Sequence, residues 1–316
     1  MSRSRYALLA ALLGLLPMLL PLSVDASVPL VPEIAGHFIT ETASVQFSLS
    51  AMVLGIAVGQ LIYGPLSDRF GRKPVILLGI ASYAATALAC ANAPTIEALI
   101  GLRFLQGFFA CSGVIVARAV IRDLFDREAG ARLFALMMGI HGIMPTIAPG
   151  LSGWLSVAYG WQSVFLTMAG FAVFSGLAIL LGLAETNTST EKQSLHPRTI
   201  AANYRQVFGV RSFLCYGVCG SFMYGALMAY FAGAPVGLIQ YLGLSPLEFG
   251  IAMAVPMVSY IIAQVVVARV AHQVGIDGMI RNGAILATIA GIVMLAFILS
   301  GKITVYTLMG PVVLLL

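Results

Sequence analysis

The chain has 316 residues, of which 60% are hydrophobic and only 9% are charged, and its formal net charge is +5. A chain this apolar has too little polar surface to cover a soluble globule, so we expect an all-α polytopic membrane protein. The basic residues lie in short segments between long apolar runs, where they set orientation in a membrane, so no nucleic-acid partner is expected. The expected partners are the lipid bilayer and a small-molecule substrate, and we expect a monomer.

Long apolar segments recur along the chain, and a helix needs about 20 such residues to cross a bilayer. The expected spans are 6–31, 43–66, 74–93, 96–118, 132–155, 162–183, 210–232, 247–268 and 282–300, with a tenth beginning near Ile303. Lysines and arginines concentrate before the first span and in the even-numbered loops, which predicts a cytoplasmic N-terminus. A secretory signal peptide ending near Ala26 is the alternative for the first segment, but its apolar character continues through Val31.

A polar segment, Glu185–Arg205, separates the first six spans from the rest. It indicates a boundary between two bundles, because polar residues without apolar periodicity are typical of connections. We therefore expect a six-helix bundle over 1–184, a cytoplasmic linker over 185–209 and a second, incomplete bundle over 210–316.

The two bundles show weak internal similarity. The shift that lays Gly71 on Gly275 also lays Gln60 on Gln264, which indicates two related halves. By that shift Leu316 falls in the middle of the fourth span, so we expect two further helices to be missing. A chain that stops there is expected to insert and bind substrate poorly, and a non-transporting fragment is one alternative for its function.

One acidic residue, Asp25, lies deep within an expected span. A charged side chain at the centre of a bilayer costs about 2.5–3.5 kcal/mol on insertion scales, so such a residue usually has a function. Arg103 lies in the fourth span, and Gln106 lies one turn along on the same face. We expect Asp25 to carry a proton in alternating contact with Arg103 or with substrate. Snorkelling of Arg103 to the outer face is the alternative.

Several chemistries have no support in the sequence. The patterns G-x-x-x-x-G-K, H-E-x-x-H and G-x-S-x-G are absent, so we expect neither ATP-driven transport nor an enzyme. The four cysteines lack metal-type spacing and are expected to be small buried hydrophobes, so no metal site is expected. The remaining driving force is ionic, and one charge crossing 100 mV is worth about 2.3 kcal/mol. Protons are the expected coupling ion, with no other cofactor.

The sequence GPLSDRFGRKP follows the second span as a basic loop. Its glycines permit a tight turn and close helix approach. Its aspartate can cap a helical turn or pair with a cation, and its three cations can anchor to headgroups or neighbouring helices. The loop resembles the motif between helices 2 and 3 of the major facilitator superfamily. The resemblance implies a cytoplasmic gate formed by Gly64, Asp68, Arg69, Gly71, Arg72 and Lys73.

The fifth expected span contains GIHGIMPTIAPGLSGWL, which is similar to a motif of antiporter branches of this superfamily. Pro145 and Pro149 each remove a helical hydrogen bond, and Gly142 and Gly153 allow close packing. The resemblance implies a helix that bends against a helix of the other half. Ordinary kinking without a role in antiport is the alternative.

The first span carries the frame LSVDASVPLVPEIA, and the segments GWQSVF and YFAGAPVGLIQYLGLSP occur further along. With the fifth-span prolines, these resemble the Bcr/CflA drug-resistance transporters along essentially the whole chain. The resemblance implies a major facilitator fold and export of drugs or small metabolites by proton antiport across a bacterial inner membrane. An uptake symporter or a facilitator on the same scaffold is the alternative.

Four polar or aromatic residues are candidates for lining the substrate cavity: Gln106, His141, Tyr224 and Tyr230. His141 either titrates within the fifth span or bonds a backbone carbonyl as a neutral ring. The tyrosines lie among methionines, which suit an adaptable apolar cavity.

Overall fold

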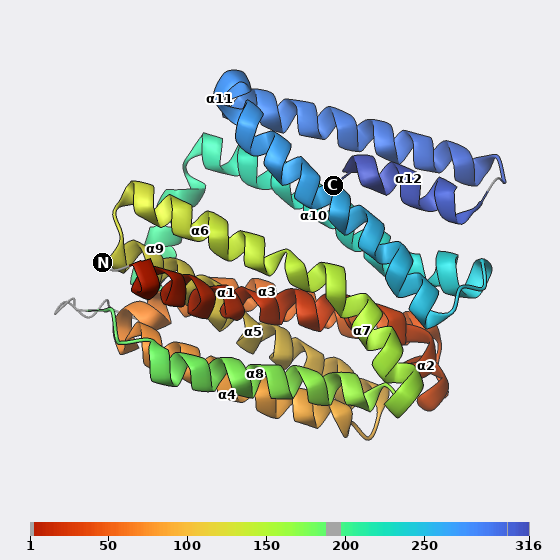
Figure 1. Ribbon diagram of the computed structural model, residues 1–316, viewed down its shortest axis with the longest axis horizontal. Coiled ribbons are helices and arrows are strands. Elements are labelled where there is room, and N and C mark those ends of the chain that lie inside the picture. Colours follow the sequence, from red (N-terminus) through yellow and green to blue (C-terminus); the bar gives the residue numbers. More distant parts are fainter. Residues whose placement is uncertain (1–2, 188–196, 302, 316) are drawn as a thin grey trace. The chain divides into compact units, whose positions relative to one another are not determined.

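The computed structural model describes residues 3–187, 197–301 and 303–315 (Figure 1). These residues form helices joined by short turns, with no strand among them, which confirms the expected all-α fold. They divide into two compact units, Met1–Ala201 and Ala202–Leu316. The division falls inside the expected linker, of which residues 188–196 lie outside the described residues. The rest of that linker contains α9 (Pro197–Phe208), a helix that the sequence analysis did not predict.

The N-terminal unit is built from helices of very different length, in the order α1 (Arg3–Asp25), η1 (Val28–Leu30), α2 (Val31–His37), α3 (Thr42–Phe70), α4 (Arg72–Ala91), α5 (Ile96–Leu124), α6 (Arg127–His141), α7 (Ile143–Tyr159) and α8 (Gln162–Gly182). Helix α3 packs along α5, and α4 packs against α5 and α8 (Figure 1). Helix α1 contacts α5, α6, α7 and α8. It forms the centre of this unit, where Leu13, Leu16 and Leu19 are fully buried.

Small residues bring α3 and α5 into backbone contact. A Cβ atom added to Gly107 on α5 would lie 2.1 Å from the carbonyl oxygen of Met52 on α3. A Cβ atom on Gly55 would lie 2.0 Å from the carbonyl oxygen of Phe104. In hydrocarbon, where lipid competes equally for apolar side chains, this close approach is a principal source of helix association.

Two expected spans prove to be interrupted, so the prediction of single continuous helices there is wrong. Helix α1 ends at Asp25, and the chain continues through η1 and α2 to His37. Helix α6 ends at His141, and α7 begins at Ile143. Each helix ends four residues before a proline, Pro29 or Pro145. A proline ring clashes with the carbonyl of the residue four positions earlier and cannot donate to it, which is why the helices stop there.

The expected loop from Gly64 to Pro74 is also not a loop. Helix α3 runs to Phe70 and α4 begins at Arg72, so Gly71 alone separates them. Gly71 has φ 98° and ψ 155°, a conformation that favours glycine and reverses the chain within one residue. Gly64 lies inside α3, and a Cβ atom there would meet nothing within 4 Å among the described residues, so its expected close approach is not made there.

The second unit contains α10 (Arg211–Pro235), the π-helix η2 (Val236–Tyr241), α11 (Pro246–Leu299) and α12 (Val305–Leu315). Helix α11 covers two expected spans and reverses at Gly275, where φ is 74° and ψ is 167°. The two glycines that the internal repeat aligns, Gly71 and Gly275, therefore turn the chain in the same way.

Among the described residues, seven helical segments are long and apolar enough to cross a membrane. The first of them, Ala7–His37, includes most of α1 together with η1 and α2. The sequence analysis expected nine such spans. The difference arises where α6 and α7 divide one span into helices of 15 and 17 residues, and where Leu247–Tyr260 forms a shorter apolar segment. The prediction of a multi-span membrane protein is confirmed.

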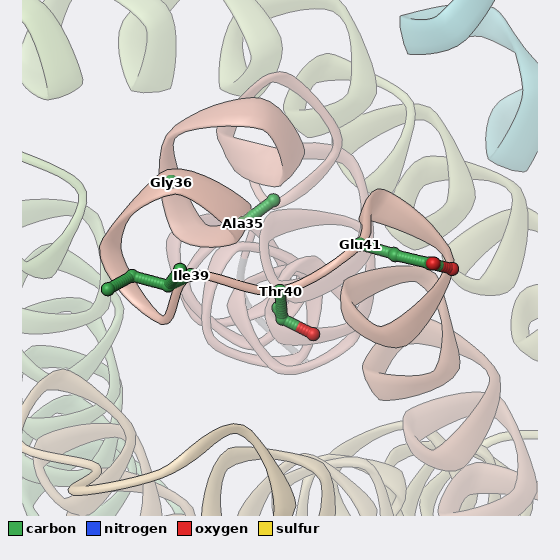
Figure 2. Close-up of a pocket in the computed structure, with 5 residues that line it drawn as sticks. All are labelled: Ala35, Gly36, Ile39, Thr40 and Glu41. Carbon is green, nitrogen blue, oxygen red and sulfur yellow. The ribbon is translucent and has the colours of Figure 1, made fainter.

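An open hollow of about 610 Å³ lies at the turn between α2 and α3 (Figure 2). It is lined by Ala35, Gly36, Ile39, Thr40 and Glu41. None of the residues expected in a functional site lines it; those residues lie in the interior of the units and at the turn at Gly71.

Candidate functional site

Asp25 lies at the break in the first span. It is the last residue of α1 and only 7% of it is exposed. Within the part of the chain that the structure describes, its carboxylate forms no hydrogen bond and no ion pair within 4.0 Å. An ionised carboxylate buried without a partner is costly, so this position needs a proton or a cation to neutralise it.

Arg103 lies inside the unit, 1% exposed, and donates to the end of α1. Its Nη2 donates to the Ser23 carbonyl oxygen at 2.8 Å. That carbonyl lacks a backbone N–H partner because the helix stops two residues later and the Ser27 N–H bonds Val24 instead. It accepts from the Ser27 hydroxyl as well, at 2.7 Å. A cation at a helix C-terminus is favourable because the carbonyl dipoles point toward it. The snorkelling alternative for Arg103 is therefore wrong.

Neutral groups complete the surroundings of Arg103. Its Nη1 donates to Gln106 Oε1 at 2.6 Å, and its guanidinium carbon lies 5.6 Å from the centroid of the Phe165 ring. Gln106 is fully buried and its Nε2 contacts Met168 Sδ at 3.7 Å, so it faces the protein interior rather than an open cavity. Arg103 and Asp25 form no ion pair in this conformation. The charge on Arg103 is therefore compensated by the Ser23 carbonyl, the Gln106 amide and the face of the Phe165 ring. The Asp25 carboxylate is not used for this purpose.

Tyr83 belongs to the same cluster and was missed by the sequence analysis. It is fully buried on α4, and its hydroxyl pairs with the Ser23 hydroxyl. Ser23 Oγ also donates to the Leu19 carbonyl at 2.7 Å. A tyrosine within an apolar run carries no local signal of such a partner, because the partner lies 60 residues away.

His141 bonds a backbone carbonyl, as the second of its two interpretations expected. Its Nδ1 lies 3.0 Å from the carbonyl oxygen of Pro17 on α1. That carbonyl has no helical partner, because its partner would be the missing N–H of Pro21. The contact ties the break between α6 and α7 to the proline-containing part of α1.

The remaining residues of the antiporter-type motif lie in or beside α7. The Gly142 N–H bonds the Met138 carbonyl at 3.0 Å and closes α6, while Pro149 and Gly153 are buried within α7. Helix α7 contacts α1, η1 and α8, all in its own unit. Bending of this helix against the other half stays a prediction.

Other expected residues lie in the second unit. The Tyr230 hydroxyl is close to two methionine sulfurs, Met309 at 2.9 Å and Met253 at 3.7 Å, whereas Tyr224 is half exposed.

The prediction that the cysteines are buried is correct for Cys90 and Cys111 and wrong for Cys215 and Cys219. Those two are exposed because α10 leaves most of its surface uncovered by the described residues. No cluster of metal-ligating side chains occurs among the described residues.

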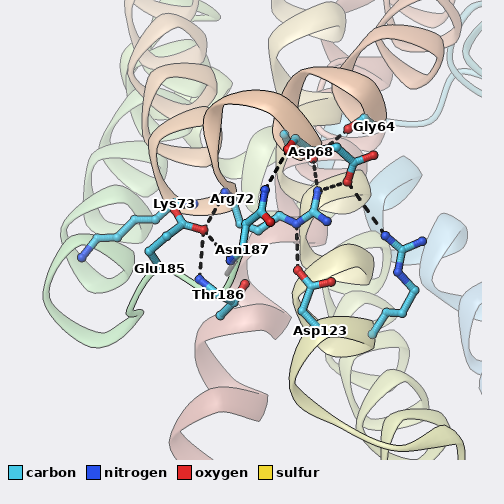
Figure 3. Close-up of polar contacts among 10 residues, drawn as sticks. Gly64, Asp68, Arg72, Lys73, Asp123, Glu185, Thr186 and Asn187 are labelled. Carbon is cyan, nitrogen blue, oxygen red and sulfur yellow. Dashed lines mark hydrogen bonds and ion pairs between the residues drawn. The ribbon is translucent and has the colours of Figure 1, made fainter. Parts of the chain in front are cut away.

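The turn at Gly71 carries a network of charges centred on Arg72 (Figure 3). Arg72 is buried, and its Nη1 lies 2.5 Å from Asp68 Oδ1 while its Nε lies 2.9 Å from Asp123 Oδ2. Asp68 therefore pairs with a cation rather than capping a helix, the second of its two expected roles. Asp123 lies in the last turn of α5 and was not predicted, although an acid at the end of a span could have been considered as a partner.

Glu185 follows the end of α8 and caps the start of the neighbouring helix α4 (Figure 3). Its two carboxylate oxygens accept from the backbone N–H groups of Arg72 at 2.9 Å and Lys73 at 3.0 Å. An anion at a helix N-terminus satisfies free donors and the helix dipole. Partial burial acts to raise the pKa of Glu185, but its bonds to four backbone N–H groups outweigh this and the pKa is lowered. The sequence analysis missed Glu185 as a partner of the gate motif.

The other two cations of the motif differ in their surroundings. Lys73 Nζ donates to the Leu180 carbonyl oxygen near the end of α8 at 2.8 Å. Arg69 is exposed, and its guanidinium carbon lies 5.7 Å from the centroid of the neighbouring Phe70 ring. The expectation that the cations of the motif anchor to neighbouring helices is therefore correct for Arg72 and Lys73.

Glu33 forms a second clamp that the sequence analysis missed. Its Oε1 accepts from the Trp161 backbone N–H at 3.0 Å, and its Oε2 accepts from the Ser156 hydroxyl. It thereby joins α2, the segment after the break at Asp25, to the turn between α7 and α8.

Comparison with known proteins is consistent with this architecture. The family described as Major Facilitator Superfamily matches residues 13–316. An uncharacterized MFS-type transporter, YdgK of Bacillus subtilis, is 33% identical over 291 residues, which cover 91% of this chain and 72% of the relative. A bicyclomycin resistance protein homolog of Haemophilus influenzae is 29% identical over 279 residues, covering 88% and 70%. An inward-facing bacterial homolog of the human lysosomal transporter Spinster has a TM-score of 0.71 at 15% identity, covering 100% of this chain and 74% of that chain.

Proposed function

Because the chain belongs to the Major Facilitator Superfamily, a family of membrane transporters and not of enzymes, we propose that it exports small molecules in exchange for protons. The similarity to a bicyclomycin resistance protein homolog supports export of drug-like compounds. We further propose a bacterial inner-membrane location with a cytoplasmic N-terminus, on the distribution of Lys and Arg between the loops.

The observation that carries this proposal is the surroundings of Asp25. It is a buried carboxylate at a helix break, with no ionic partner among the described residues, and the Ser23 carbonyl near the same helix end accepts from Arg103. Broken helices near the bilayer midplane are where transporters of several folds bind substrates and ions. In our proposal Asp25 takes up a proton from one side and releases it when a cationic group or a rearranged Arg103 approaches.

In this proposal, the cluster around Ser23 links proton release from Asp25 to the conformational change. Arg103 donates to the Ser23 carbonyl in this conformation, in which α1 ends at Asp25. A shift of α1 during rocking of the two units would release the guanidinium toward the carboxylate two residues away in sequence. Proton release and the change of conformation are then coupled through one hydrogen bond.

The charge network at Gly71 is proposed to act as the cytoplasmic gate. Arg72 joins α3, α4 and α5 through Asp68 and Asp123, so these helix ends move together. Lid and gate motions limit turnover in many proteins, and a network of this kind sets the cost of opening.

The test uses purified chain reconstituted into proteoliposomes with an imposed pH gradient. Efflux of ethidium and bicyclomycin is measured together with proton movement, reported by a pH-sensitive dye in the lumen. Asp25→Asn should insert normally and abolish gradient-driven efflux, while Asp25→Glu should retain part of it. Asp126→Asn, an acid that caps α6 from outside the site, is the matched control. Undiminished gradient-driven efflux by Asp25→Asn would remove Asp25 from the mechanism, and substrate moving with the protons would replace export by uptake.

A further inference from the structure

An apolar hollow of about 500 Å³ lies between α3, α4 and α5 beside the turn at Gly71. Aromatic and aliphatic side chains line it, with Gly79 and Ser82 at its inner end, and Phe70 and Pro74 at the turn. From Pro74 to Ser82 the lining of α4 extends over about 12 Å. Leu78 and Phe70 are strongly exposed there, so the hollow opens on the outer surface of this unit.

A second, polar hollow of about 630 Å³ adjoins the first and shares Phe70 and Pro74 with it. Its lining includes Arg69, Lys73 and Asn187. The two hollows together form one groove, polar at the turn and apolar along the helices. This amphipathic layout matches a lipid with its headgroup at the membrane surface and its acyl chain in the hydrocarbon.

The polar end is lined by two cations, Arg69 and Lys73, of which Arg69 is available to an anion. Two carboxylates also line it, but Glu185 is held by four backbone N–H groups and Asp68 by Arg72. Arg69 forms no ion pair with any described residue, and its guanidinium lies over Phe70, the residue common to both hollows. A cation is therefore left at the junction where a phosphate would lie.

We propose that this groove binds an anionic phospholipid, with one acyl chain between α3, α4 and α5 and the phosphate at Arg69. Basic pockets between transmembrane helices are known to select anionic headgroups. The bound lipid would cover Phe70 and Leu78 and lie against the outside of the Arg72 network (Figure 3). Lipid composition would then influence the same turn that holds Asp68 and Arg72.

The experiment places a tryptophan reporter in the groove of the full chain in nanodiscs. Fluorescence of Leu78→Trp is quenched with brominated-chain phosphatidylglycerol or with brominated-chain phosphatidylcholine, titrated against unlabelled lipid. The signal of native Trp154 and Trp161 is subtracted using the parent chain. Phe174→Trp, an exposed position on α8 outside the groove, is the matched reporter control.

Phosphatidylglycerol should occupy the groove about fivefold more tightly than phosphatidylcholine, the effect expected of one cation near an anionic headgroup. Phe174→Trp should show no preference. Arg69→Gln in the Leu78→Trp background should abolish the preference, Arg69→Lys should keep most of it, and Arg211→Gln should leave it unchanged. Equal quenching by the two lipids at Leu78→Trp, or a preference that survives Arg69→Gln in protein that elutes as a single species, would overturn the proposal.

Discussion

Substitution of Gly107 by alanine tests the backbone contact that holds α3 to α5. The added methyl carbon would lie 2.1 Å from the Met52 carbonyl oxygen, so the helices must separate by more than about 1 Å to reach an ordinary contact near 3.5 Å. Overpacking of this kind costs about 1–3 kcal/mol. For a unit of this size each kcal/mol lowers the midpoint by about 2–4 °C, so we expect a drop of about 2–12 °C.

The assay is the apparent unfolding midpoint in detergent at one fixed scan rate, because membrane proteins often unfold irreversibly. Gly101→Ala on the same helix is the control, since its Cβ atom would meet nothing within 4 Å. Alanine there should leave the midpoint unchanged or raise it, because alanine is favoured over glycine in a helix by up to about 1 kcal/mol. If Gly107→Ala were as stable as Gly101→Ala, the close approach of α3 and α5 would be refuted.

Three further outcomes concern the charged residues. Asp68→Asn removes one partner of Arg72 and should slow turnover more than it weakens substrate binding; a collapse of affinity at normal saturated turnover would contradict the gate. The lowered pKa of Glu185 means that its carboxylate stabilises the folded chain above the unfolded value near 4.3, and that this contribution is lost as pH falls through the folded pKa. The unfolding midpoint of the parent chain should therefore fall more steeply with acidification than that of Glu185→Gln, and parallel curves would argue against the cap. Arg103→Lys keeps the charge but cannot reproduce the two separate bonds to Ser23 and Gln106. Gradient-driven efflux in proteoliposomes should therefore fall at least about tenfold. Near-normal efflux would show that the positive charge alone is sufficient.

Much of the architecture follows from short-range rules. Hydrophobic segment length was enough to establish a multi-span helical membrane protein, and the motif at Gly64–Pro74 was enough to indicate the family. Gly71 was correctly identified as a tight-turn position, because only glycine adopts its conformation at low cost. The breaks after Asp25 and His141 are also encoded locally, by Pro29 and Pro145, although the sequence analysis assigned continuous helices there.

The partners of the functional side chains were decided by tertiary packing. Arg103 bonds a carbonyl 80 positions earlier in the chain, and Glu185 caps a helix more than 110 positions earlier. The sequence indicated that a buried arginine needs a partner and favoured an acid. The broken helix instead supplies the Ser23 carbonyl, which lacks a backbone N–H partner, and composition does not reveal this. Which carbonyl or N–H lies within 3 Å depends on how α1, α4, α5 and α8 pack, and that geometry arises only when the helices are assembled.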